Sequence, residues 1–268
     1  MIRRFALVAT AGILFSIPGM AALIGLSDGS PGTLYSIDPG TGAATPIVTM
    51  SGGSLTSLVG LEVLNGTIYA TDVLENGPYS FGTIDPTTGV FTALNDQGGS
   101  ANWHGLAANV AANLLYSVDL NNSNSLVTVT PDGLTITVIG ATGADIRGLA
   151  YDDANGILYG ADYGNLYTID TTTGVATLVG ATGLDDGTPG LAFDPVTGIL
   201  YLNAGFLQNL YTLDTATGAA TLVGANGASY INGLAYIPDG EVPEPATMAL
   251  SAAGLAALAL VRRRKRSA

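Results

Sequence analysis

The chain has 268 residues and a formal net charge of −13 at pH 7. Residues 22–241 contain 20 of the 21 acidic residues and a single basic one, so their formal charge is −19. Such a surface repels phosphate backbones and anionic membranes, which argues strongly against nucleic-acid binding, and accepts a neutral or cationic polymer more easily than an acidic one. No cysteine is present, so a disulfide framework and thiolate chemistry are both excluded.

Residues 1–22 have the pattern of a secretory signal peptide. Arg3 and Arg4 precede an apolar run over residues 5–17, and small residues suited to cleavage follow near residues 21–22. An uncleaved membrane anchor is the alternative. We therefore expect the chain to be exported across the inner membrane.

A unit of just over 40 residues is repeated through the central part of the chain. Its first marker is a Gly-Leu pair, and the steps between successive copies are 45, 43, 42 and 43 residues. The pairs begin at Gly60, Gly105, Gly148, Gly190 and Gly233. Within residues 148–180, four apolar runs (GLAY, ILYGA, NLYTI and VATLVG) are separated by Asp, Asn, Gly and Thr turns, which predicts a four-stranded antiparallel sheet.

The second marker is the turn Asp-x-x-Thr-Gly. It occurs at residues 38–42, 85–89, 170–174, 194–198 and 214–218, and with Asn for Thr at residues 152–156. The aspartate can accept hydrogen bonds from backbone N–H groups two or three residues on, and glycine takes the positive φ of a tight hairpin. We therefore predict a structural role for these aspartates.

A four-stranded repeat of this length is typical of a β-propeller blade. Four units are complete, and Gly233–Pro238 supplies an opening strand while Ala22–Val48 supplies the other three strands of a fifth unit. The sequence thus predicts an all-β fold, a five-bladed β-propeller over residues 23–240, closed by pairing of its N- and C-terminal strands. It resembles the repeat propellers common in secreted bacterial proteins, although the Trp-Asp dipeptide of the best-known propeller repeat is missing.

One face of the predicted disc is the best candidate for a pocket. The Asp-x-x-Thr-Gly turns share the opposite face, so the residues that precede each Gly-Leu pair should form a ring on this one. That ring is Val59, His104, Arg147, Pro189 and Asn232, and the nearby second strands end in Asp72, Asp119 and Asp162. We predict a binding pocket formed by His104, Arg147, Asn232, Asp72, Asp119 and Asp162. The alternative is that Trp103 and His104 only plug the channel mouth and Arg147 only pairs with local aspartates.

Catalysis is not predicted, because no nucleophile and base occur at a recognisable spacing and there is no Gly-x-Ser-x-Gly. The alternative is a secreted lyase or hydrolase on carbohydrate, acting through His104, Arg147 and a tyrosine such as Tyr151. Alanine at His104 would then abolish turnover.

No cofactor and no metal site are predicted. Residues 119–125 have oxygen ligands at alternate positions, but Asn124 stands where a calcium loop needs glycine, and Thr130 stands at its acidic twelfth position. Weak calcium binding at this loop, or at Asp185 and Asp186, would make the protein a calcium-stiffened scaffold, which is a further alternative.

Residues 241–268 carry a three-part signal. Val242, Pro243, Glu244 and Pro245 are followed by sixteen uncharged residues, 246–261. A helix of that length spans about 24 Å, and its flanking residues can make up the difference from the roughly 30 Å hydrocarbon core. A basic cluster then follows: Arg262, Arg263, Arg264, Lys265 and Arg266. We predict a single C-terminal transmembrane helix with the basic cluster in the cytoplasm and the propeller outside.

This order resembles the PEP-CTERM sorting signal of exopolysaccharide-producing Gram-negative bacteria. The resemblance implies recognition by an exosortase, a membrane cysteine transpeptidase-like enzyme, with cleavage near Pro243, Glu244 and Pro245 and release or transfer of the propeller to the cell surface. A plain membrane anchor is the alternative. The function expected is a non-catalytic interaction or structural component of an exopolysaccharide or biofilm matrix, with exosortase, exopolysaccharide and other surface proteins as partners.

Overall fold

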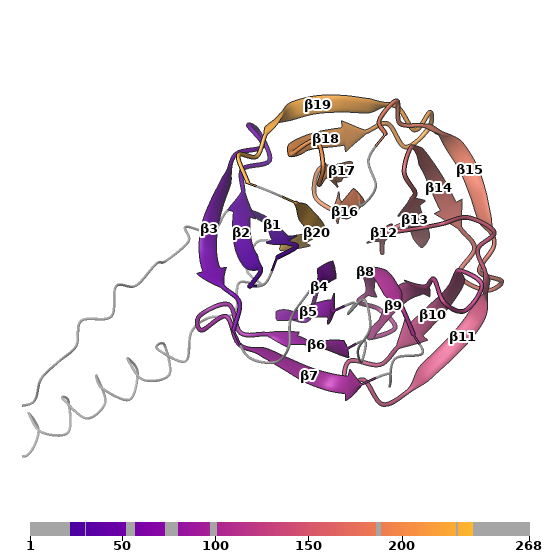
Figure 1. Ribbon diagram of the computed structural model, residues 1–268. Coiled ribbons are helices and arrows are strands. Elements are labelled where there is room, and N and C mark those ends of the chain that lie inside the picture. The colour runs from indigo at the N-terminus through magenta and orange to yellow at the C-terminus, as the bar shows by residue number, and fades with distance from the viewer. Residues whose placement is uncertain are drawn as a thin grey trace, which may run out of the picture.

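The computed structural model describes residues 22–29, 31–51, 57–72, 80–96, 101–185, 189–228 and 230–237. These residues form five four-stranded antiparallel sheets arranged in a ring (Figure 1). The predicted signal peptide up to residue 21, the C-terminal helix and the sorting motif lie outside the described residues. Within the described part of the chain, no helix has the length and apolar character needed to cross a membrane.

Four blades follow the chain from the inner strand to the rim. Blade 1 contains β4 (Leu58–Leu64), β5 (Thr67–Asp72), β6 (Ser80–Ile84) and β7 (Phe91–Asp96). Blade 2 contains β8 (Trp103–Asn109), β9 (Leu114–Asp119), β10 (Ser125–Val129) and β11 (Ile136–Ala141). Blade 3 contains β12 (Gly148–Asp152), β13 (Ile157–Ala161), β14 (Asn165–Ile169) and β15 (Ala176–Ala181). Blade 4 contains β16 (Pro189–Asp194), β17 (Ile199–Ala204), β18 (Asn209–Leu213) and β19 (Ala220–Ala225).

Blade 5 joins the two ends of the described chain. Its inner strand is β20 (Ile231–Ile237), followed outward by β1 (Ala22–Ser27), β2 (Thr33–Ile37) and β3 (Ala44–Thr49). β20 pairs antiparallel with β1, with Tyr236 opposite Leu23 and Leu234 opposite Gly25. The predicted five-bladed ring and its closure by the terminal strands are confirmed.

The Gly-Leu marker has a packing explanation. Each glycine lies on an inner strand that closely approaches the inner strand of the next blade. A Cβ added at Gly233 would lie 2.7 Å from the Leu61 Cβ, and one added at Gly148 would collide with the Pro189 carbonyl oxygen. Only glycine allows this approach, so the period of the sequence is the period of contacts around the axis.

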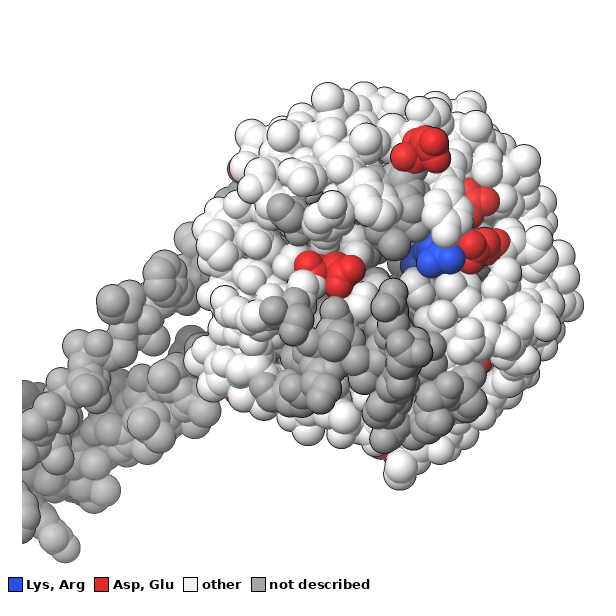
Figure 2. All heavy atoms as spheres, in the orientation of Figure 1, with Lys and Arg blue, Asp and Glu red and all other residues white. Residues whose placement is uncertain are grey.

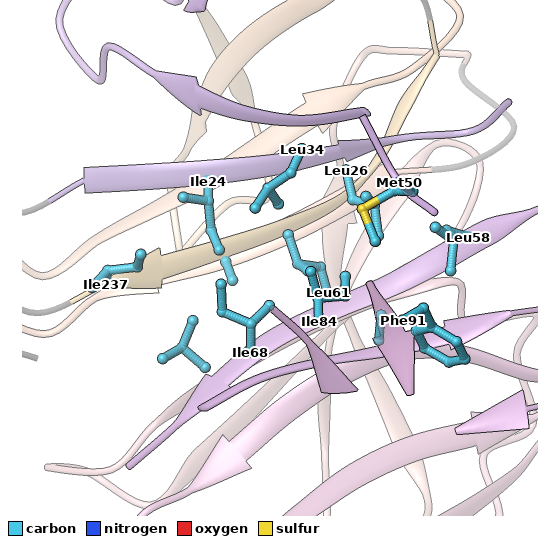
Figure 3. Packing of buried hydrophobic residues seen from close by; sticks show 13 residues of the cluster. Ile24, Leu26, Leu34, Met50, Leu58, Leu61, Ile68, Ile84, Phe91 and Ile237 are labelled. Carbon is cyan, nitrogen blue, oxygen red and sulfur yellow. The ribbon is translucent and has the colours of Figure 1, made fainter. Parts of the chain in front are cut away.

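The hydrophobic core lies in layers between neighbouring blades. Between blades 5 and 1, Ile24 and Leu34 face Leu61, Ile68 and Ile84 (Figure 3). Leu34 and Leu61 are 0 % and 1 % exposed, and burying a leucine side chain contributes about 1.5–3 kcal/mol. Because each blade needs its neighbours to bury its sheet, the core fixes the position of the inner strands around the axis.

The predicted role of the turn aspartates is also confirmed. In the hairpin between β14 and β15, one carboxylate oxygen of Asp170 accepts hydrogen bonds from the Thr172 and Thr173 amides at 2.8 and 3.0 Å. Gly174 closes the turn with a φ of 82°. The corresponding aspartates in the other turns accept the same pair of amides: Asp38, Asp85, Asp152, Asp194 and Asp214.

Candidate functional site

The predicted ring of residues surrounds a narrow hollow at the centre of one face. We call this the site face, and the face with the Asp-x-x-Thr-Gly hairpins the turn face. Val59, Arg147, Pro189 and Asn232 line the hollow together with the Gly-Leu pairs. The volume of the hollow is about 10 Å³, room for about one water molecule. The inner strands therefore approach too closely to enclose a sugar ring.

His104 is the predicted ring residue that does not line the hollow. A bulge shifts the register of β8 on β9, so that His104 lies opposite Val118 and Trp103 opposite Asp119. Gly105 within this bulge has a φ of 63°. A bulge adds a residue to one strand and redirects the side chains beside it. His104 is 6 % exposed as a result.

The buried environment keeps the His104 imidazole neutral. Burial and, to a smaller extent, the nearby charge of Arg147 together lower the pKa of His104 to about 3. A general base works best with a pKa near the working pH. An imidazole with this pKa is a poor proton acceptor at neutral pH.

Trp103 is a core residue. Its side chain is 3 % exposed, and its ring centre lies 6.1 Å from that of Phe81, which in turn stacks on Tyr69 at 5.5 Å. This cluster packs blade 1 against blade 2. Trp103 therefore fills the space between the first two complete blades, and it does not line the central hollow.

Arg147 makes local contacts beside the hollow. Its guanidinium lies 3.1 Å from the Asp145 carboxylate and 5.0 Å from the centre of the Tyr163 ring. Its Nε atom is buried and has no hydrogen-bond partner. Figure 2 shows one basic group on this face, near the centre of the ring and with acidic groups around it. The local pairing that the sequence left as an alternative is thus present.

The predicted aspartates lie on the site face, but their oxygens hold their own loops. Asp162 accepts hydrogen bonds from the Asn165 amide and the Tyr167 hydroxyl, both at 2.7 Å. Asp119 accepts the amides of Asn102 and Asn121, and Asp72 accepts the amide of Ser57. Through these hydrogen bonds the three carboxylates stabilise nearby loops, as the aspartates of the turn face do.

Tyr151 does not lie beside the ring residues. It follows Arg147 by four residues along β12, which corresponds to about 13 Å of strand. Its ring packs on Tyr116 with centres 5.6 Å apart, and its hydroxyl accepts a hydrogen bond from the Asn109 amide at 3.3 Å. His104, Arg147 and Tyr151 therefore do not converge on one substrate atom.

The candidate calcium loop is held by hydrogen bonds of its own. The Asp119 carboxylate accepts hydrogen bonds from the Asn102 and Asn121 amides, and the Ser125 hydroxyl donates to the Asn122 carbonyl at 2.5 Å. Among the described residues, no three His, Cys, Asp or Glu side chains come together as metal ligands would. Asp186 lies outside the described residues.

Sequence reasoning missed an exposed aromatic patch on the site face, made of Phe206, Leu207 and Tyr230. Their side chains are 56 %, 43 % and 45 % exposed. Blade 4 has Ala204 where blades 1, 2 and 3 have an aspartate at the end of the second strand or directly after it, and Phe206 and Leu207 follow. This departure from the repeat was the available signal.

Glu62 was also missed. Glu62 lies on β4, opposite Tyr69 of β5. The corresponding inner-strand residue of every other blade is alanine: Ala107, Ala150, Ala192 and Ala235. The Glu62 carboxylate accepts hydrogen bonds from the Val63 amide at 2.7 Å and from the Ala108 amide of blade 2 at 3.3 Å. Burial raises its pKa to about 8.

The ring of blades defines the class of protein as a five-bladed β-propeller, and solved structures share its fold. A chain in the crystal structure of a Nidogen/Laminin complex has 19 % identity and a TM-score of 0.54, over 79 % of this chain and 80 % of that one. A protein of unknown function from Bacteroides thetaiotaomicron has 17 % identity and a TM-score of 0.50, over 76 % and 50 %. TolB from Acinetobacter baumannii has 12 % identity and a TM-score of 0.51, over 81 % and 54 %. At these identities the likeness shows the fold alone.

Residues 241–265 match the family model of the PEP-CTERM protein-sorting motif. The predicted sorting motif is thus confirmed, and together with the five blades it supports an exosortase-type substrate that carries a propeller domain. The motif implies an exported, membrane-anchored precursor that is processed by an exosortase and sorted to the cell surface. No curated protein matches the chain.

Proposed function

We propose that the sorted propeller is a non-catalytic binding component of an exopolysaccharide or biofilm matrix. The narrow central hollow carries this proposal. With a volume of about 10 Å³, this hollow is too small to enclose a sugar ring, so a polymer would lie across the site face. The formal charge of −19 over residues 22–241 favours a neutral or cationic polymer.

The catalytic alternative has less support. The pKa of His104 is about 3, which suits neither a general base nor a general acid at neutral pH. Tyr151 lies too far from Arg147 along β12 for both side chains to contact the same substrate atom. A propeller that binds polysaccharide without cutting it is the simpler account.

The test uses residues 22–241, which contain all five blades and their closing strand. The purified domain is mixed with the exopolysaccharide of the producing organism, and masses are followed by light scattering after size-exclusion chromatography. We expect protein and polymer to elute together at larger mass. Polymer of unchanged mass with free protein would contradict the proposal, and shortened polymer would favour a lyase or hydrolase.

The scaffold alternative is tested in the same preparation. Calcium that raises the melting temperature of the domain, with no polymer bound, would favour a calcium-stiffened scaffold. We expect added calcium and a chelator to leave the melting temperature unchanged.

A further inference from the structure

Two aromatic rings meet on the open site face between blades 4 and 5. Phe206 lies in the loop that joins β17 to β18, and Tyr230 lies just before β20. Their ring centres are 5.5 Å apart and the ring planes are perpendicular. Both side chains are about half exposed, at 56 % and 45 %. Together with Leu207 they form an apolar corner of this face.

A buried polar network fixes this corner. The Asn203 side chain donates a hydrogen bond of 2.6 Å to the Ile231 carbonyl, next to Tyr230, and the Asn226 side chain donates one of 2.8 Å to Asn203. The two asparagines are 0 % and 2 % exposed. The backbone of Tyr230 itself is held by the Asp28 amide, which donates to the Tyr230 carbonyl at 2.7 Å.

Tyr230 also has an unfavourable backbone conformation. Its φ is 52°, in the left-handed region that bulky residues rarely adopt. Strain of this kind persists where the surrounding structure imposes it, and it is concentrated at ligand-binding positions. Glycine would adopt this φ without strain, so the backbone conformation alone does not call for a tyrosine here.

Polar groups flank the patch on the same face. Asn232 follows Tyr230 by two residues and lines the central hollow, and Arg147 lines the hollow from the other side. Tyr163, which packs on Arg147, is 42 % exposed and offers a further ring. Asn232 is 4 % exposed and donates to Asp28, so the Arg147 guanidinium and the Tyr163 ring are the more accessible groups beside the patch.

We infer that the aromatic patch of Phe206, Leu207 and Tyr230 is a binding site for the sugar units of an uncharged or amino-bearing polysaccharide. A pyranose ring has one face of C–H groups, which packs on an aromatic ring, and a rim of hydroxyl groups, which bonds to amides and charged side chains. The acidic domain repels uronic acids and attracts protonated amino groups. This inference rests on the proposed function and adds the class of sugar and the residues.

The probes are hexamers of N-acetylglucosamine and of glucosamine, with alginate oligomers as the acidic comparison. Binding to the domain of residues 22–241 is measured by titration calorimetry. Phe206→Ser removes one ring, and Tyr230→Gly removes the other while relieving the strained backbone. Val196→Ser is the matched control, because Val196 is 73 % exposed on the turn face of the same blade.

We expect the wild-type domain to bind one or both glucosamine hexamers and not alginate. Each patch variant should weaken binding about tenfold or more, as for an aromatic residue at the centre of an interface. The control should bind as the wild type does. Melting temperatures of all four proteins show whether a loss of binding reflects unfolding, and we expect Tyr230→Gly to melt at or above the wild-type temperature.

The failures are distinguishable. Unchanged binding by both patch variants would overturn the site and leave the matrix function standing. Binding of the organism's own polymer without binding of either hexamer would overturn the assigned sugar class. Loss of hexamer binding in the patch variants, in a protein that ignores the native polymer, would support the site and reject the matrix function. Dimerisation abolished by Phe206→Ser, with no sugar binding, would assign the patch to a second copy.

Discussion

Replacing Glu62 with alanine should make the stability of the propeller less dependent on pH. Glu62 is the one carboxylate at a position that is alanine in the other four blades, and burial raises its pKa from 4.5 to about 8. At low pH the carboxyl is protonated in both the folded and the unfolded chain, so it costs nothing. As the pH rises from 4.5 to 8, the unfolded chain releases the proton while the folded chain retains it, and the free energy of unfolding falls.

The size of this effect follows from the two pKa values. The difference between 4.5 and about 8 corresponds to about 5 kcal/mol, which is an upper limit. Part of the Glu62 side chain reaches solvent, and screening there reduces the cost to about 2–5 kcal/mol. The hydrogen bonds from the Val63 and Ala108 amides favour the charged carboxylate, and their effect is already contained in the pKa of about 8.

The assay is urea unfolding of the wild type, Glu62→Ala and Glu62→Gln at pH 5 and pH 9. We expect Glu62→Ala to be as stable as the wild type or slightly less stable at pH 5, and more stable at pH 9. Glutamine keeps an acceptor for the two amides without the charge, so it should gain stability at pH 9 with no loss at pH 5. If the wild type and both variants lost the same free energy between the two pH values, the reasoning about Glu62 would be wrong.

Three further predictions concern other parts of the chain. His104→Ala should reduce the loss of stability in acid. Between about pH 6.5 and 3 the imidazole takes up a proton in the unfolded chain but stays neutral in the folded one, so the free energy of unfolding falls as the pH falls. Urea unfolding at pH 7 and pH 4 tests this. Gly148→Ala should lower the melting temperature more than Gly143→Ala, because the first added Cβ collides with Pro189 of the next blade, whereas the second meets no atom and costs only the strain of a φ of 77°. Glu244→Gln should leave unprocessed precursor at the membrane, seen as a larger band on an immunoblot; normal processing would show that the carboxylate is not recognised.

The sequence predicted the ring well because its markers are the contacts of the ring. The Gly-Leu pair recurs wherever inner strands touch, and the Asp-x-x-Thr-Gly turn recurs wherever a hairpin closes. Both requirements are local and identical in each blade, so a single chain contains several copies of the same signal. The closing blade could be predicted from the same markers, because the N-terminal part supplies three strands of the repeat and the C-terminal part supplies the fourth.

The candidate site was harder to predict. His104 has the expected spacing from its Gly-Leu pair, but the bulge at Gly105 turns its side chain away from the hollow. Gly105 has a φ of 63°. Because every copy of the repeat has glycine at this position, the sequence does not reveal which copy contains the bulge. The aromatic patch was missed for another reason. Reasoning from what the blades share gives no weight to Ala204, the residue at which blade 4 departs from the others.

Glu62 and His104 give the free energy of unfolding opposite dependences on pH, and together they set the pH range in which the propeller is most stable. Glu62 lowers stability as the pH rises above 4.5, and His104 lowers it as the pH falls below 6.5. Between these values the two slopes offset each other, so a broad maximum is expected from about pH 4.5 to 6.5. The turn aspartates do not disturb this range: the Thr172 amide lowers the pKa of Asp170 below 3.8, so its contribution is lost only in stronger acid. Without Glu62 the His104 slope is no longer offset, so the Glu62→Ala variant should move the maximum to above about pH 6.5, and the His104→Ala variant should move it to below about pH 4.5.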